Sequence, residues 1–310
     1  MRLRRVIAVT AAAAAAVLAT TAAVFPGVPA DRPQPLPALT TPALDARYAA
    51  DSRMIAQAAR AADRAGNQGL ARALEALRGQ HFLDFNPRGP GLVVEVLGDL
   101  ARARRVAILV PGSDTSLTTF DSRGTASPGG AARALAAQAR RIDPRAHLAI
   151  IAWLGYAPPA TLSPGVLTSG DAGQGALALR PLVDDLARHG DQVVLICHSY
   201  GSVVCGLAAP HLPVTDIAAI GSPGMDASSV QALHTTARVW AGQGAGDWIR
   251  DVPHIQLLGL GFGADPASPA FGARLFDCGG GGHSGYFQPG SIALRNLADI
   301  ALGHAAGVTR

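Results

Sequence analysis

The stretch from residue 192 to residue 205 constrains the fold more than any other part of the chain. Its first residues, 192–196, form a short and mostly apolar run with β-branched members, which predicts a central strand of a parallel sheet. Residues 202–207 are small and largely apolar, which favours a helix packed closely against that sheet. Between them, Cys197-His198-Ser199-Tyr200-Gly201 has the spacing small-x-Ser-x-Gly, which predicts a very tight turn that lifts the Ser199 hydroxyl above the sheet edge.

Two interpretations of Ser199 follow from this turn. In the first, Ser199 belongs to an ordinary strand-to-helix turn, because the short spacing pattern also arises by chance. In the second, Ser199 is a nucleophile, and the helix that begins beneath it favours negative charge on a reacting oxygen. The position two before the serine is usually Gly and is Cys197 here, which is a sterically modest departure. The second interpretation is favoured because an acid and a histidine follow in the required order.

A serine hydroxyl is a poor nucleophile unless a histidine takes its proton and an acid holds that histidine. One known chain order for such a group is Ser, acid, His. Asp247 is the predicted acid, because it follows the strand expected at 237–241 through a glycine-rich turn. His283 is the predicted base, because the glycine run at 279–282 lets the backbone bring its imidazole over the sheet edge.

Other acids and histidines compete for these roles. Asp226 and Asp251 are alternatives to Asp247, and each of the three could instead cap a turn. Of the nine histidines, His198 adjoins the nucleophile but is expected to point away from it, and His254 follows the predicted acid too closely. Chain order and spacing therefore favour Asp247 as the acid and His283 as the base.

The negative oxygen that forms during acyl transfer needs hydrogen-bond donors that are already in place. One predicted donor is the backbone N–H of Tyr200, the residue after the nucleophile. The other is expected in the turn after the strand at 106–110, from Ser113 or its neighbour Asp114. Gly112 lets this turn approach closely.

From residue 91 onward, predicted strands mostly alternate with predicted helices. Strands are expected at 82–85, 91–97, 106–110, 147–153, 192–196, 217–220, 237–241 and 274–278, and helices at 131–141, 176–189, 202–207, 230–236 and 291–302. This pattern predicts an α/β protein with a mostly parallel central sheet and helices on both faces. Because sites in such sheets lie at the C-terminal strand ends, the predicted nucleophile, acid, base and Ser113 should share one edge.

The N-terminal 80 residues precede this α/β domain, which is assigned to residues 81–310. Residues 1–30 combine a basic start, an Ala-rich apolar run and a small-x-small site, which predicts a signal peptide or, if uncleaved, an N-terminal anchor. Residues 31–42 contain four prolines and predict an extended linker. Residues 43–80 have apolar side chains at helical spacing, which predicts a helical segment that forms a cap or, preferably, a layer over the core.

Composition restricts the partners and cofactors. All 26 basic residues are arginines, and residues 1–30 hold three of them and no acid, so residues 31–310 carry +1 of the formal +4. No arginine cluster is interleaved with aromatic residues, so nucleic acid is not an expected partner. The glycine-rich run 242–246 lacks the third glycine and the βαβ unit of a dinucleotide site. Because paired Cys-x-x-Cys and His-Glu-x-x-His motifs are missing too, we expect no cofactor and no metal.

Residues 155–175 form a stretch rich in proline, glycine and serine that is long for a plain connection. We expect a loop over the active-site edge that shapes substrate access, rather than a merely irregular surface loop. Its apolar residues Leu162, Val166 and Leu167 would suit an acyl chain or could equally be packing.

The chain has three cysteines, Cys197, Cys205 and Cys278. Export would permit one disulfide, for which Cys205 and Cys278 are a candidate pair. The preferred expectation is three buried free thiols.

Five motifs carry a resemblance to a known family: 109–113, 197–201, 220–224, Asp247 and 282–286. Over about residues 80–304, the chain resembles the α/β-hydrolase superfamily, and more narrowly a bacterial α/β-hydrolase family common in actinobacteria and once described as a domain of unknown function. The resemblance implies the α/β-hydrolase fold and a triad of Ser199, Asp247 and His283. It implies no particular substrate.

Together, residues and resemblance predict an exported serine hydrolase that acts on small-molecule or lipid carboxylic esters through an acyl-enzyme. Thioester hydrolysis and acyl transfer are alternatives on the same fold. The alternative of another class is a non-catalytic, envelope-associated binding protein. The expected location is secreted or in the cell envelope, with membrane contact only through residues 1–30 if they are not cleaved. Acyl length and oligomeric state are left open.

Overall fold

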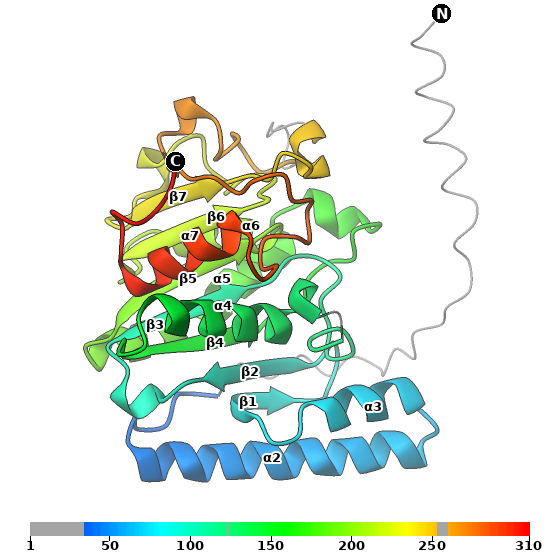
Figure 1. Ribbon diagram of the computed structural model, residues 1–310. Helices are drawn as coiled ribbons and strands as arrows, with labels where there is room; N and C mark the ends of the chain where they lie inside the picture. Colours follow the sequence, from blue (N-terminus) through cyan, green and yellow to red (C-terminus); the bar gives the residue numbers. More distant parts are fainter. Residues whose placement is uncertain (1–33, 123, 253–259) are drawn as a thin grey trace, which may run out of the picture.

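The computed structural model describes residues 34–122, 124–252 and 260–310 (Figure 1). The predicted leader and the first residues of the linker lie outside the described residues, as does His254. Within the described ranges, no helix combines the length and the apolar character that crossing a membrane requires.

An eight-stranded sheet forms the centre of the molecule (Figure 1). Its strands are β1 (His81–Asn86), β2 (Leu92–Leu97), β3 (Arg105–Val110), β4 (Leu148–Leu154), β5 (Gln192–His198), β6 (Asp216–Ile220), β7 (Arg238–Gly242) and β8 (Arg274–Leu275). The spatial order is β1-β2-β4-β3-β5-β6-β7-β8. β1 pairs antiparallel with β2, and β2 with β4, whereas all other neighbours are parallel. The predicted mostly parallel sheet is confirmed.

Helices cover both faces of the sheet. The α-helices are α2 (Thr41–Arg64), α3 (Gln68–Ala76), α4 (Pro128–Ile142), α5 (Gly170–Arg188), α6 (Gly201–Ala208) and α7 (Ile292–Leu302). Short 3₁₀ helices are η2 (Leu100–Arg102), η3 (Gly124–Ala126), η4 (Pro164–Leu167), η5 (Gln231–Leu233), η6 (Trp248–Asp251) and η7 (Pro269–Phe271). α4 and α7 pack side by side on the face in front in Figure 1, and α5 and α6 pack together on the opposite face.

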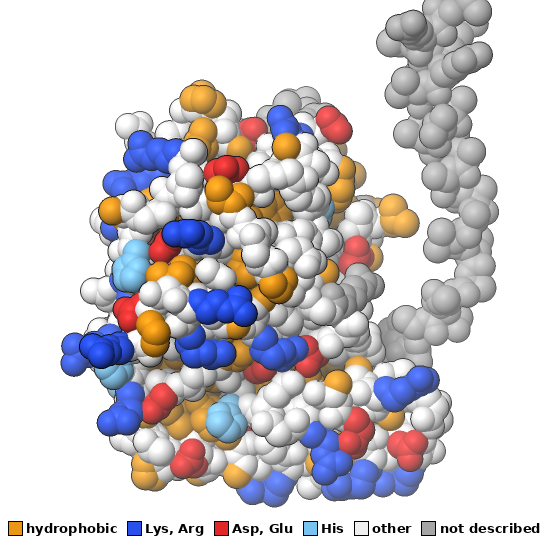
Figure 2. Space-filling model, viewed as in Figure 1, with side chains coloured by type: hydrophobic (Ala, Val, Ile, Leu, Met, Phe, Trp, Pro, Cys, Tyr) orange, Lys and Arg blue, Asp and Glu red, His pale blue; other side chains and the backbone are white. Residues whose placement is uncertain are grey.

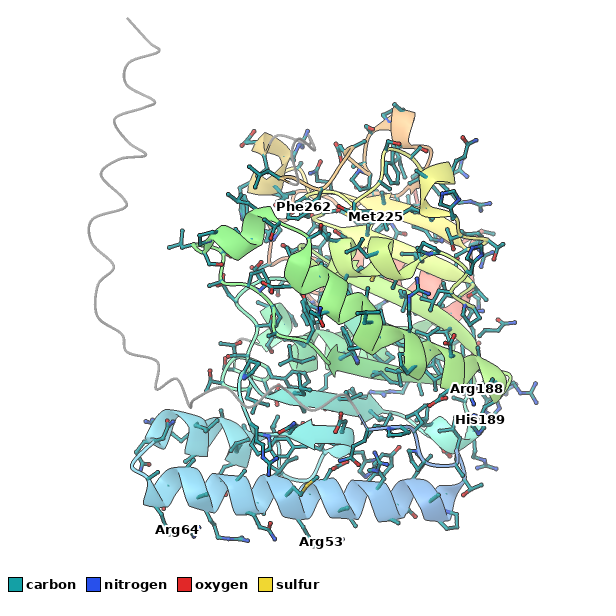
Figure 3. All side chains as sticks on the ribbon, turned by 180° about the vertical axis from the view of Figure 1, so that it is seen from behind. Arg53, Arg64, Arg188, His189, Met225 and Phe262 are labelled. Atoms are coloured by element: carbon teal, nitrogen blue, oxygen red, sulfur yellow. A yellow bond between two sulfur atoms is a disulfide. The ribbon has the colours of Figure 1, made fainter. Side chains whose placement is uncertain are left out.

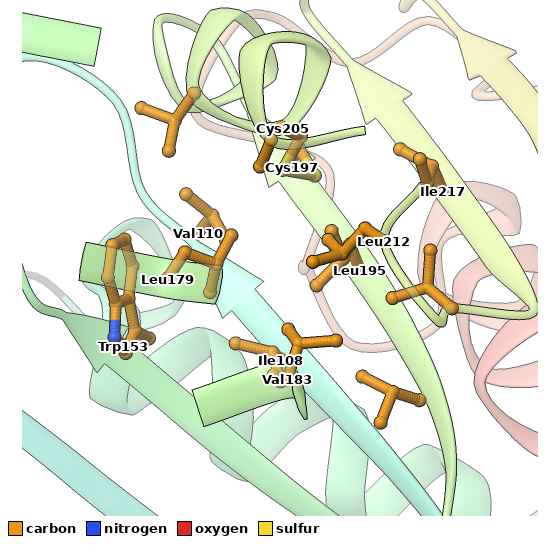
Figure 4. Close-up of a cluster of buried hydrophobic side chains, with 14 of the residues drawn as sticks. Ile108, Val110, Trp153, Leu179, Val183, Leu195, Cys197, Cys205, Leu212 and Ile217 are labelled. Atoms are coloured by element: carbon orange, nitrogen blue, oxygen red, sulfur yellow. A yellow bond between two sulfur atoms is a disulfide. The ribbon is translucent and has the colours of Figure 1, made fainter. Parts of the chain in front are cut away.

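The two faces hold separate hydrophobic cores, which explains why the central strands are apolar throughout. In β5, Val193, Leu195 and Cys197 belong to the core under α5 and α6 (Figure 4), whereas Val194 and Ile196 belong to the core under α4 and α7. Successive side chains of a strand point to opposite faces, so a strand buried on both sides loses the apolar–polar alternation.

The N-terminal helical segment covers the edge of the sheet rather than the predicted site. The two helices α2 and α3 are separated at residues 65–67, and α2 packs along β1 at the sheet edge opposite β8 (Figure 1). Arg53 and Arg64 project from the outer side of α2 in Figure 3. A covered edge strand cannot pair with another chain, so this segment completes the core and protects β1.

Two elements are shorter than predicted. Instead of a helix over 230–236, the chain forms only η5, because His234 has a left-handed backbone with φ of 47° that ends the turn. The strand predicted at 274–278 is limited to β8, because the Asp277 N–H donates to the carbonyl of Thr309 rather than continuing along β7.

Charged side chains of both signs are interspersed on the face seen in Figure 2, with arginines along α2 at its lower edge. This face therefore has no continuous basic patch of the kind that binds a nucleic-acid backbone.

α2 carries a buried carboxylate, Asp51, which is 1% exposed. Neither of its carboxyl oxygens has a hydrogen-bond partner among the described residues. Burial raises the pKa of Asp51 from 3.8 to about 7, with Arg47 lowering it and Asp84 raising it further. Between these two pH values the folded chain holds a proton that the unfolded chain releases, so stability from this group falls as pH rises toward 7.

Asp51→Asn should remove this proton linkage. We expect the variant to be more stable than the wild type by about 1 to 3 kcal/mol at pH 8, and the difference to shrink toward pH 5, where Asp51 is protonated. Urea unfolding at pH 5, 6.5 and 8 measures the effect, with the exposed Asp45→Asn on the same helix as the control. Parallel pH profiles for wild type and Asp51→Asn would contradict the assignment.

Candidate active site

Ser199 lies in the turn between β5 and α6, and its backbone is left-handed with φ of 55°. Residues with a side chain rarely adopt this conformation, so the surrounding structure must hold it. The Ser199 N–H donates to the carbonyl of Ile220 on β6 at 3.0 Å. Gly201 lets α6 begin close to β3, since a Cβ there would lie 2.4 Å from the Val110 carbonyl oxygen. The tight turn that the sequence predicts is present.

The three side chains predicted to form the site meet at the C-terminal edge of the parallel strands. Ser199 Oγ lies 2.9 Å from His283 Nε2. His283 Nδ1 lies 2.9 Å and 3.1 Å from the two carboxyl oxygens of Asp247. In this arrangement the serine hydroxyl donates to Nε2 and the Nδ1–H donates to the carboxylate. Asp247, and not Asp226 or Asp251, is the acid that contacts His283.

The Asp247 carboxylate is fully buried, yet it remains ionised. Burial raises its pKa, but donors from His283, the Tyr286 hydroxyl and the Ile249 N–H outweigh burial and hold the pKa below the usual value. The Tyr286 hydroxyl lies 2.5 Å from Oδ2, and the Ile249 N–H lies 2.9 Å from Oδ1. An ionised acid stabilises a protonated His283 during proton transfer.

Tyr286 lies three residues after His283, and the sequence alone indicated no role for it. Its hydroxyl accepts a hydrogen bond from the Gly244 N–H at 3.1 Å while it donates to Asp247. Burial and the bond to Asp247 raise the pKa of Tyr286 far above its usual value, so it remains a donor. Tyr286 thereby links the loop after β7 to the loop that carries the histidine.

His198 also has a role that sequence analysis missed. Its Nε2–H donates to the backbone carbonyl of His283 at 2.8 Å, and the two rings are 4.8 Å apart. Burial, followed by the neighbouring His283, lowers the pKa of His198 to about 4. As predicted, His198 does not contact Ser199 Oγ; it holds the backbone of the base instead. In the sequence, only the position of His198 next to Ser199 indicated that it could have a role in the site.

The turn after β3 passes directly against Ser199. A Cβ on Gly112 would lie 2.6 Å from the Ser199 Cβ, so only glycine lets the backbone run there. Of the two donors considered in this turn, Asp114 is occupied, because its N–H donates to the Pro159 carbonyl at 3.1 Å. The N–H of Ser113 has no acceptor among the described residues, which makes it the available donor of the pair.

Tyr200 supplies the second candidate donor. Its N–H likewise has no acceptor within the described part of the chain. Its phenol is anchored away from the reacting atoms, since the hydroxyl donates to the Thr168 carbonyl at 2.6 Å and accepts from the Ala172 N–H at 3.2 Å. The backbone at Tyr200 is thereby fixed at the start of α6.

A pocket of about 510 Å³ opens over Ser199 and His283. Its lining includes Thr161, Val166 and Leu167, so the loop predicted at 155–175 does border the site. The lining also includes Leu109, Ala131, Ile196, Tyr286 and Phe287, all of which belong to the core under α4 and α7. The lining residues that the structure describes are mostly apolar, and no arginine is among them. In the described ranges, no three His, Cys, Asp or Glu side chains cluster so that they could hold a metal ion.

The cysteines differ from both expectations. Cys197 and Cys205, which lie next to each other in Figure 4, form a disulfide. Cys278 is free and buried. The reason lies in the two faces of the sheet: α6 folds back over β5, which brings Cys197 and Cys205 into one core, whereas Cys278 lies in the other. A bridge between Cys205 and Cys278 would have to cross the sheet.

A family model described as "Alpha/beta hydrolase" matches residues 86–257, which is more than half of the chain. The chain therefore belongs to the alpha/beta hydrolase family, and its strand order and Ser-acid-His chain order agree with that membership.

Two uncharacterized proteins of Mycobacterium tuberculosis, Rv2079 and MT2140, are each 32% identical to this chain over 252 residues. The match covers 70% of this chain and 38% of each relative, so the chain spans about two fifths of their length.

Among solved structures, similar folds include a serine hydrolase without a lid, XC6422 from Xanthomonas campestris, and the esterase PE8. XC6422 is 18% identical, with 73% of this chain and 94% of that chain covered and a TM-score of 0.44. PE8 is 17% identical, with 67% and 97% covered and a TM-score of 0.45.

The disulfide should be detectable by thiol counting. We expect one reactive thiol, that of Cys278, in the denatured but unreduced protein. Cys197→Ala/Cys205→Ala should lower the free energy of unfolding by about 2 to 3 kcal/mol, because the bridge closes a short loop in the unfolded chain. Denaturant unfolding measures this loss, with Cys278→Ala as the variant that keeps the bridge. Three reactive thiols in protein made in an oxidising compartment would contradict the pairing.

Proposed function

We propose that this chain is an exported serine hydrolase that cleaves carboxylic esters through an acyl-enzyme. The observation that carries the proposal is the unbroken line of hydrogen bonds from Ser199 through His283 to Asp247 at the floor of an apolar pocket. Membership of the alpha/beta hydrolase family supports hydrolysis as the reaction class.

In the acylation step, Ser199 Oγ attacks the ester carbonyl carbon while its proton passes to His283 Nε2. The carbonyl oxygen becomes negative and is stabilised by the N–H groups of Ser113 and Tyr200. The carbon–oxygen bond to the alcohol then breaks, and the alcohol leaves with the proton from Nε2. The product is an acyl ester of Ser199. Asp247 stays ionised and stabilises the imidazolium that exists between these transfers.

Deacylation repeats the sequence with water. His283 Nε2 takes a proton from the water as its oxygen attacks the acyl carbon, and the same two N–H groups stabilise the negative oxygen. The bond to Ser199 Oγ then breaks, the proton returns to Oγ, and the carboxylic acid leaves. Because the pKa of His198 is about 4, His198 is neutral in the neutral pH range and donates its Nε2–H to the His283 carbonyl without adding positive charge beside the imidazolium.

The pocket supports an uncharged substrate. Among the described residues that line it, Asp114 and the two histidines are the only Asp, Glu, His or Arg side chains, so none of these residues offers a guanidinium to a phosphate or carboxylate. An ester with an apolar acyl group matches such a lining.

Export is supported by two independent features. Residues 1–30 have the composition of a signal peptide. The bridge between Cys197 and Cys205 is of a kind that persists in oxidising compartments and is rare in the cytosol.

Substitution of the three central residues tests the proposal. Ser199→Ala and His283→Ala should each lower kcat/KM for p-nitrophenyl butyrate by about 10⁴-fold or more, and Asp247→Asn by about 10⁴-fold. Ser199→Ala should also abolish labelling by a fluorophosphonate. Ser113→Ala is the control, because it keeps the backbone donor and should retain activity within a few fold of the wild type. A folded wild-type protein that is neither labelled nor active would favour the binding-protein alternative.

His198 should act as a positioning residue. His198→Ala removes the donor to the His283 carbonyl and should lower kcat by about ten- to a hundredfold with little change in KM, because the base is misplaced rather than lost. His198→Gln presents an N–H at a similar reach and should restore much of kcat. If His198→Ala changes KM alone, or if both variants lose kcat equally, the positioning role is wrong.

A further inference from the structure

The described residues include six large apolar side chains that are well exposed: Leu162, Leu167, Leu177, Trp248, Leu260 and Leu275. A single exposed leucine is ordinary in a soluble protein, but a group of them at one place marks an interaction surface. Four of the six lie around the mouth of the pocket. We call Leu162, Leu167, Trp248 and Leu260 the apolar rim.

Two members of the rim line the pocket, and the other two are chain neighbours of residues at its mouth. Leu167 and Trp248 line the pocket themselves. Leu162, which is 87% exposed, follows directly on the pocket residue Thr161. Leu260 precedes Gly261, whose N–H donates to the Leu167 carbonyl at 3.0 Å.

The rim comes from separate segments that meet at the same end of the sheet as Ser199. η4 and η6 lie together at this end in Figure 1, and apolar atoms protrude beside η4 at the right of the face in Figure 2. Phe262, which also lines the pocket, lies just beyond the rim residue Leu260 and is labelled near this end in Figure 3. Trp248 connects the rim to the reacting groups, since its ring centre is 4.7 Å from that of His283 and it is still 51% exposed.

Charges beside the rim indicate what kind of surface fits it. Two exposed acids lie near the rim. Asp114 lines the pocket, and Asp251 is the last residue of η6, which also carries Trp248. Arg250, the basic residue of η6, donates to the Ala245 carbonyl at 3.3 Å. Among the described residues, the pocket lining holds the acid Asp114 and no arginine, which disfavours the anionic headgroups that bind polybasic membrane proteins.

We propose that the apolar rim binds the surface of an aggregated, uncharged ester, such as a droplet of neutral lipid, and so presents the pocket to substrate at that surface. Leu167 and Trp248 belong both to the rim and to the pocket lining, so an acyl chain that leaves the droplet meets apolar side chains at the entrance to the pocket that contains Ser199. Burying exposed leucine and tryptophan in lipid recovers the free energy that their exposure to water costs. Binding by the rim stands apart from catalysis, whereas hydrolysis at the droplet rests on the proposed function.

Flotation with triolein droplets tests binding without hydrolysis. Three full-length proteins are compared, and all three carry Ser199→Ala. The first has no other substitution, and the second adds Leu162→Gln/Leu260→Gln. The third adds Leu177→Gln/Leu275→Gln and is the matched control. Leu162 and Leu260 are not among the residues that line the pocket, and the N-terminal 33 residues are identical in all three proteins. We expect the rim variant to partition at least about tenfold more weakly than the other two, since two apolar side chains leave the contact.

Three results would overturn the proposal: no flotation of the Ser199→Ala protein, equal partitioning of the rim and control variants, or stronger binding to phosphatidylcholine or phosphatidylglycerol vesicles than to droplets. The last result would identify a membrane surface instead.

Activity provides the second measurement. With an intact Ser199, Leu162→Gln/Leu260→Gln should keep the wild-type rate on dissolved p-nitrophenyl butyrate and lose at least about tenfold on emulsified triolein at limiting droplet area. Equal loss on both substrates would contradict the rim's role. If dissolved ester is not hydrolysed by the wild type while the Ser199→Ala protein still floats, the proposed function fails and the binding surface stands.

Discussion

The site depends on the left-handed backbone of Ser199, a conformation that costs about 1 to 3 kcal/mol for a residue with a side chain. Three features of the fold offset this cost. The Ser199 N–H bonds to Ile220 on the neighbouring strand, Gly201 lets α6 begin against β3, and a disulfide from Cys197 to Cys205 joins the two sides of the turn. Cys197 stands where glycine is usual in such a turn, and the bridge uses its side chain to reinforce the same connection. The strained conformation is what directs Oγ to the base.

The second constraint is the fixed position of His283, which is held at two separate points. Asp247 accepts from the ring, and His198 donates to the backbone carbonyl of the same residue. Tyr286 then fixes Asp247 from the far side. These polar contacts are buried beneath a pocket that is mostly apolar, so each is stronger than it would be in water. At this edge of the sheet, the polar groups lie beneath the pocket and exposed apolar side chains lie around its mouth. This arrangement suits a reaction between polar groups that takes place on an apolar molecule.

Local patterns in the sequence predicted the strands and the turn at Ser199, because periodicity and spacing report these directly. Chain order selected Asp247 and His283, which lie in one line of hydrogen bonds with Ser199. They could not predict which cysteines pair, since that depends on α6 returning over β5 while Cys278 lies across the sheet. They also could not assign His198 and Tyr286, whose partners are distant in the chain or are backbone atoms. The helix expected at 230–236 has good local composition but ends at His234, where the backbone is left-handed.

The central claim is that an acyl group is transferred to Ser199 during turnover. The most direct measurement is intact-protein and peptide mass spectrometry after rapid acid quenching during hydrolysis of p-nitrophenyl butyrate. We expect one added butyryl group per chain, located on the peptide that contains Ser199, together with a burst of nitrophenol that matches the amount of enzyme. Hydrolysis without any adduct, or an adduct on a different residue, would contradict it.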